Sequence, residues 1–203
     1  MKHTIALIAA LLFAPIAYGQ STTAANKVLN PDSTDKVVSW FKKLIVDFDA
    51  IATKEEKLQF IRMLEKLHVS LQKLQTKKEA FTRLLLSYSL SPEDQQIKGK
   101  LRRAYEELRD SYQVVLTRIS DISPKIREEL RAEGNELQNL ISDSMSERSK
   151  GITLMEHELK NSNIDHEKLK KTAEKGIAAL VKAEEALAKQ IKEMKEKTKV
   201  SVI

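Results

Sequence analysis

The sequence predicts an all-α protein, either an elongated antiparallel bundle or paired helical hairpins, with four long helices and one short N-terminal helix. The 203-residue chain has only five glycines and four prolines, and 5% of its residues are aromatic. This composition disfavours folds rich in sheets or loops. Apolar residues recur at alternating steps of three and four over long stretches, which is the spacing of a helix face. Prolines and capping residues fall between these stretches and separate the helices.

The first 19 residues have the features of a cleavable secretory signal. Lys2 supplies the charged start, an apolar run follows over 5–14, and small residues precede Gln20. This run is shorter than the roughly 20 residues that span a bilayer, and no comparable run follows it. We therefore expect a periplasmic or secreted protein whose mature chain has no transmembrane helix. The lack of cysteine agrees with a chain large enough to bury a core without disulfides.

The mature chain is expected to form one helical bundle domain over residues 31–199. A polar tail over 20–30 precedes this domain, and a short C-terminal tail over 200–203 follows it. Asn30 has the chemistry of a helix cap, and Pro31 suits the first turn of a helix. A short first helix is therefore predicted from this point to about residue 52.

Capping residues also mark the next two helices. Thr53, followed three residues later by Glu56, matches a capping box and predicts a long helix over about 54–89. Ser91 is predicted to cap the third helix, with Pro92 at its first helical position. This helix should continue to about residue 122, because apolar residues keep the helical period to that point.

The second half of the chain is less sharply divided. Ser123 and Pro124 repeat the signal of a cap followed by proline, which favours a reversal of the chain over a kink in one helix. The helical period continues over 126–159, although serines crowd residues 142–151 and weaken that stretch. We expect a helix that still forms across it. A last helix is predicted over about 165–199.

The second helix carries an apolar seam that could bind another helix, from a partner protein or from a second copy of the chain. Lys78 interrupts this seam. A polar residue within such a seam lowers stability but can fix helix register. Alternatively, Lys78 lies at the end of a core, with its methylenes on the seam and its ammonium in water; the sequence leaves both interpretations open. The seam comprises Phe60, Leu64, Leu67, Leu71, Leu74, Lys78 and Phe81.

Glu65 and His68 have the spacing with which helical bundles present two ligands to a di-metal site. Such a site also needs a second Glu-x-x-His pair, and neither His157 nor His166 supplies one. His68 is therefore expected to flank the seam as a partly exposed side chain. The chain also lacks a cysteine nucleophile and a glycine-rich phosphate loop. We predict a non-enzymatic protein with no metal, no other cofactor and no small-molecule substrate.

Positive charge is concentrated in the second and last predicted helices. The formal net charge is +6. Lysines at the end of the last helix complement its dipole, whereas those elsewhere could attract anionic lipid, an anionic envelope polymer or an acidic partner helix. The low aromatic content disfavours nucleic acid as a ligand. The candidate contacts with an anionic surface are Lys42, Lys43, Lys66, Lys73, Lys77 and Arg83.

Two functions are compatible with these features. The leading one is a coiled-coil or helical-bundle protein that acts through protein–protein interaction, as a scaffold, adaptor or chaperone. The alternative is an amphipathic bundle that binds lipid or a membrane surface, as a carrier or helical pore-former. Trp40, Phe41 and Phe48 of the first helix could make the lipid contact, although core packing explains them better.

The last three residues, Ser201, Val202 and Ile203, form a candidate recognition tail. A short apolar tail with a free carboxylate can add as a strand to a partner's groove.

Overall fold

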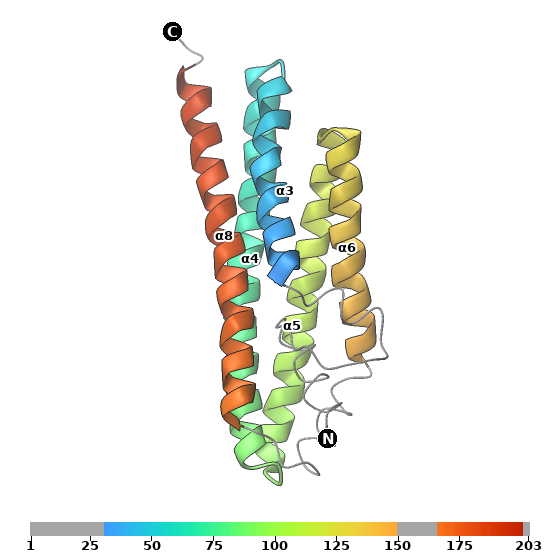
Figure 1. The fold of residues 1–203 in the computed structure, drawn as a ribbon, viewed down its shortest axis with the longest axis vertical. Coiled ribbons are helices and arrows are strands. Elements are labelled where there is room, and N and C mark those ends of the chain that lie inside the picture. Colours follow the sequence, from blue (N-terminus) through green and yellow to red (C-terminus); the bar gives the residue numbers. More distant parts are fainter. Residues whose placement is uncertain (1–30, 150–165, 201–203) are drawn as a thin grey trace.

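The computed structural model describes residues 31–149 and 166–200, and all regular structure in this part of the chain is helical. The predicted all-α class is confirmed, with five α-helices that pack against one another (Figure 1). None of the helices in these ranges combines the length and apolar character needed to cross a bilayer. The predicted signal, the polar tail and Ser201 to Ile203 lie outside the described residues. The elements are α3 (Pro31–Ala50), α4 (Lys54–Leu90), α5 (Gln95–Ile122), the 3-10 turn η1 (Ser123–Lys125), α6 (Glu128–Ser149) and α8 (His166–Val200).

The helices run along one long axis, and each packs mainly against two others. The main contacts join α4 to α5 and α8, α3 to α8 and α6, and α5 to α6. In Figure 1, α4 and α6 run downward, whereas α3, α5 and α8 run upward. Polar contacts agree with this: Glu65 of α4 pairs with Lys195 near the end of α8, and Ser89 bonds to His166 at its beginning. Helices α4 and α8 are therefore antiparallel.

Helix α3 lies parallel to α8, and two ion pairs record their alignment. Lys182 Nζ lies 2.7 Å from Asp35 Oδ1, and Lys197 Nζ lies 2.6 Å from Asp49 Oδ2. Lys197 is one of the C-terminal lysines expected to complement the helix dipole. Pairing between helices is thus a second role for this residue, one that composition alone did not reveal.

The cap of α4 was predicted correctly, whereas the cap of α5 was not. The Thr53 hydroxyl accepts a hydrogen bond from Glu56 N and donates one to the Glu56 carboxylate. Helix α5 begins at Gln95, and its N-cap is Asp94, whose Oδ1 accepts from the backbone N–H groups of the first turn. Ser91 instead closes α4 through its own backbone N–H. The assignment of Ser91 and Pro92 to the start of α5 was wrong, because aspartate caps as well as serine does.

The chain reverses between α5 and α6, as the proline signal predicted. Pro124 lies in the 3-10 turn, and the backbone is extended at Ile126 before α6 begins at Glu128. The sequence predicted that Ser123 would cap the next helix. Its hydroxyl instead donates to the Ile119 carbonyl of α5. Helix α6 continues to Ser149, so a helix does form across most of the serine-rich stretch. Residues 150 and 151 lie outside the described part.

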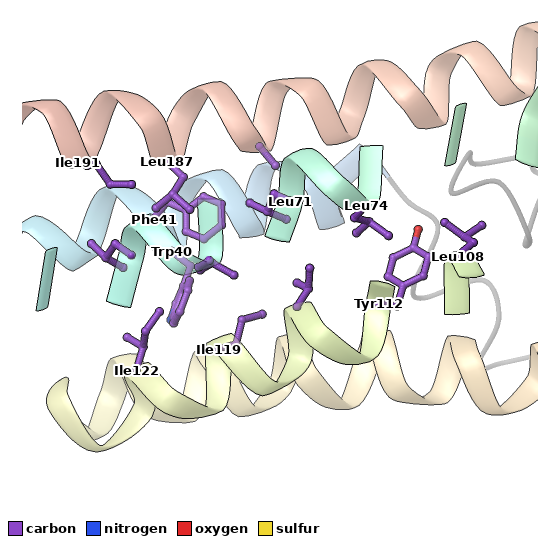
Figure 2. Close-up of a cluster of buried hydrophobic side chains, with 14 of the residues drawn as sticks. Trp40, Phe41, Leu71, Leu74, Leu108, Tyr112, Ile119, Ile122, Leu187 and Ile191 are labelled. Atoms are coloured by element: carbon purple, nitrogen blue, oxygen red, sulfur yellow. The ribbon is translucent and has the colours of Figure 1, made fainter. Parts of the chain in front are cut away.

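The core is continuous along the molecule and includes side chains from all five helices. Figure 2 shows Trp40 and Phe41 of α3 between side chains from α5 and α8. Trp40 is 1% exposed, and its indole Nε1 donates to the Leu130 carbonyl of α6 at 2.9 Å. Gly134 permits this approach, since a Cβ there would lie 3.1 Å from Trp40 Cζ2. The small residue that weakens α6 as an isolated helix thus lets it pack closely against α3.

Candidate functional site

The predicted partner seam lies inside the chain's own core. All seven of its side chains are at most 5% exposed: Phe60, Leu64, Leu67, Leu71, Leu74, Lys78 and Phe81. Leu71 and Leu74 face side chains from α5 and α8 in Figure 2. A partner helix could therefore reach the seam only if helices of the bundle separated. Its role in binding a partner stays a prediction.

The position of Lys78 decides between the two interpretations that the sequence left open, a polar group within the seam or an ammonium in water. Its side chain is 1% exposed, and Nζ donates to the Gly176 carbonyl of α8 at 2.5 Å. The interpretation in which the ammonium extends into water is therefore wrong. A backbone carbonyl has two lone pairs, so the one at Gly176 can accept from Lys78 and still serve its own helix. The bond joins one point of α4 to one point of α8, as expected of a group that sets register.

Replacing Lys78 with methionine is expected to leave the free energy of unfolding unchanged or raise it. Burying a charge is costly, and apolar groups of similar volume often replace buried charges without loss. Lys78→Ala should be about 2–5 kcal/mol less stable than Lys78→Met, because it leaves a cavity in the seam. Urea denaturation of both variants measures this difference. A marked loss of stability in Lys78→Met would instead show that the ammonium bond is a net stabilising contact.

Glu65 and His68 have different partners, both on α8. The Glu65 carboxylate pairs with Lys195 Nζ at 2.6 Å, and His68 Nε2 contacts the Glu184 carboxylate. His68 is about one-fifth exposed, in agreement with the predicted flanking position. Within the described residues, no group of three histidine or acidic side chains is arranged to hold a metal ion. His157 lies outside these residues. In this structure, both residues therefore make contacts between α4 and α8.

Lys42, Lys43 and Lys77 are three of the six candidate contacts with an anionic surface, and two of them pair with carboxylates of other helices. Lys77 Nζ lies 2.7 Å from Glu107 Oε2 of α5, and Lys43 Nζ lies 2.7 Å from Glu133 Oε1 of α6. These partners offset much of the charge of the two lysines. Lys42 is exposed on α3. Lys42 and Lys43 lie on α3, whereas Lys77 lies on α4.

The other three cations share one side of α4, which we call the outer face. Lys66, Lys73 and Arg83 are exposed and, within the described residues, have no carboxylate partner. Val69, which is 46% exposed, and Thr76 lie between them. Their spacing of three, four and seven residues keeps all five side chains on one stripe of the helix. At 1.5 Å per residue, the stripe is about 25 Å long.

The aromatic residues proposed for lipid contact are core residues in this structure. Trp40, Phe41 and Phe48 are all at most 2% exposed. Core packing, the favoured explanation, is thus the one that the structure supports. Lipid contact through these residues would require α3 to leave the bundle.

No family model, curated protein or solved structure matches this chain. Function is therefore inferred from its own residues.

Sequence reasoning missed one of the buried polar groups, Asp47, whose carboxylate is 2% exposed and accepts from the backbone N–H of Arg127 at 3.0 Å. The only available signal was a lone acidic residue beside the apolar face of the first helix, and such residues are usually solvent-exposed.

Proposed function

We propose that this protein is a non-enzymatic, periplasmic or secreted helical bundle that acts through protein–protein interaction, as a scaffold, adaptor or chaperone. The observation that carries this proposal is the outer face of α4, where Lys66, Lys73 and Arg83 have exposed charges and no carboxylate partner among the described residues. The proposed partner is an acidic helix lying along this face. The elongated architecture, with one short and four long helices, belongs to the same proposal; its packed neighbours are antiparallel except for α3 and α8, which are parallel.

The acidic residues of α4 are placed so that they do not neutralise this face. Glu65 pairs with Lys195 of α8, and Glu79 accepts a hydrogen bond from Gln75. Glu55 and Glu56 lie in the first turn of α4, near the positive end of its dipole. A row of cations on a firmly packed helix would attract an acidic partner and help to orient it.

The outer face suits a helix better than a lipid bilayer. Its apolar content is limited to Val69 and the methylene stems of the cations, whereas lipid insertion needs a broad apolar face. A partner helix needs only a narrow stripe and complementary charges. The buried seam of α4 would become available to a partner only in a second step, if the bundle opened.

A photo-crosslinking amino acid at Thr76 tests the proposal in the native compartment. We expect a defined crosslinked product, and we expect the double substitution Lys66→Glu and Lys73→Glu to abolish it. The same probe at Val114, which is 45% exposed on α5, is the matched control and should not capture that product. The double substitution Lys100→Glu and Arg103→Glu, which reverses two exposed charges on α5, should leave the Thr76 product unchanged. An unaltered product after reversal at Lys66 and Lys73 would contradict the proposal.

Two further measurements separate the alternative partners. Light scattering of the purified protein over a concentration range tests whether the partner is a second copy of the chain. Flotation with anionic vesicles at low salt tests the lipid alternative, because attraction between exposed charges weakens as salt is added. Vesicle binding that is lost on reversal at Lys66 and Lys73, without any protein crosslink at Thr76, would replace the proposed acidic helix with a lipid surface.

A further inference from the structure

A cleft of about 440 Å³ lies between the beginning of α4 and the end of α8. These two helix ends lie at the same end of the molecule, the top of Figure 1. The volume is within the range of pockets that bind small molecules, roughly 300–1,000 Å³. The cleft shares no side chain with the outer face of α4, so it can be tested independently.

Part of the lining of the cleft is apolar. Leu58 and Ile61 of α4 line it. Ile61 is buried, whereas Leu58 is 39% exposed and so presents a large apolar side chain to water. Covering this side chain with an apolar ligand group would be favourable, at about 25 cal/mol per Å² of area removed from water.

The charge around the cleft is strongly positive. Lys54, Arg62 and Lys199 line it, and within the described part of the chain none of them forms an ion pair. Lys195 also lines the cleft, but it pairs at 2.6 Å with Glu65, the one carboxylate among the lining residues. Among the described residues, three cations are therefore left without a paired carboxylate around a small apolar surface.

The uncharged polar side chain that lines the cleft is already hydrogen-bonded within α8. Thr198 lines it, and its hydroxyl donates to the Met194 carbonyl at 2.7 Å. Recognition of a polar ligand group thus depends on the cations. Arg62 can bind two oxygens of a carboxylate or phosphate at once, and the two lysines can act as point charges.

We propose that this cleft binds an anionic amphiphile, a molecule with one alkyl chain and a carboxylate or phosphate head. The chain lies against Leu58 and Ile61, and the head lies among Lys54, Arg62 and Lys199. Both parts contribute, because the apolar surface is too small to bind a chain alone and the cations are exposed enough to be screened by salt.

Calorimetric titration of the purified protein with dodecyl phosphate, below the concentration at which it forms micelles, tests this site. We expect saturable binding of one molecule per chain. Inorganic phosphate and dodecyltrimethylammonium should each bind at least tenfold more weakly, since the first lacks the chain and the second carries the wrong charge. Equal affinity for either of them, or no saturable binding of dodecyl phosphate, would overturn the proposal.

Matched variants then place the binding in the cleft. Lys54→Glu combined with Lys199→Glu should lower the affinity for dodecyl phosphate at least tenfold, whereas arginine at both positions should preserve it. Leu58→Gln should also weaken binding, and circular dichroism will verify that these surface variants are folded. The outer-face pair Lys66→Glu and Lys73→Glu should bind as the native protein does. Binding that survives charge reversal at Lys54 and Lys199 would overturn the assignment, whatever the outcome of the crosslinking at Thr76.

Discussion

Replacing Trp40 with alanine is expected to lower the free energy of unfolding by about 3–5 kcal/mol, the usual cost of deleting a large buried aromatic side chain. The side chain is 1% exposed and lies where α3 meets α6. Its loss would leave a cavity and would also remove the hydrogen bond from the indole to Leu130. Trp40→Phe removes this bond but keeps most of the apolar volume, so it should cost clearly less. Urea denaturation of both variants measures the two effects.

Gly134 provides a control for the geometry around Trp40. Adding a Cβ there would crowd the indole, at 3.1 Å from Cζ2, but alanine favours a helix by up to about 1 kcal/mol over glycine. Gly134→Ala should therefore stabilise the Trp40→Ala variant more than it stabilises the native protein. The difference is a coupling energy between the two sites. An equal effect in both backgrounds would mean that Trp40 and Gly134 are not in close contact.

Asp47→Ala is expected to destabilise the protein by about 1.5–3 kcal/mol, the range for hydrogen bonds to charged groups. Its buried carboxylate on α3 accepts from the backbone N–H of Arg127 at 3.0 Å and pairs with the guanidinium of the same residue at 2.5 Å. Arg127 immediately precedes α6, so Asp47 holds the start of that helix against α3. Without the carboxylate, a partly buried backbone N–H loses its acceptor. Thermal or urea unfolding measures the loss.

Asp49→Ala is the matched control, because it removes a carboxylate two residues away on the same helix. Asp49 is about half exposed and pairs with Lys197 at the surface. An exposed ion pair contributes about 1 kcal/mol or less. Stability losses of the same size in the two variants would show that the contact between Asp47 and Arg127 is not a special support for α6.

Local signals were sufficient to place most of the helices. The predicted second helix, over 54–89, agrees closely with α4 (Lys54–Leu90), and the predicted last helix, over 165–199, agrees with α8 (His166–Val200). Both have long stretches with helical spacing, and Thr53 caps the first of them. The start of α5 was misplaced because Ser91 and Asp94 are both good caps. A choice between two suitable neighbours depends on the path of the turn.

The candidate sites were less predictable than the helices. The candidate contacts predicted on this helix were Lys66, Lys73, Lys77 and Arg83. The structure leaves Lys66, Lys73 and Arg83 exposed on one side of α4, whereas Lys77 pairs with Glu107 of α5. The cleft near Lys54 and Lys199 was not predicted, because its two walls come from helices more than a hundred residues apart in sequence. Helical periodicity shows which residues share a face, but it does not show which faces meet.

The sequence by itself determined that the chain is helical and which side chains lie on the apolar face of each helix, because capping and periodicity act within a few residues. The tertiary structure alone decided how the helices are aligned with one another. That alignment places the Lys78 ammonium on the Gly176 carbonyl and Asp47 at the start of α6. Both contacts join residues 80 or more positions apart. A sliding pair of amphipathic helices has several alignments with similar apolar burial, so specific polar contacts of this kind distinguish among them.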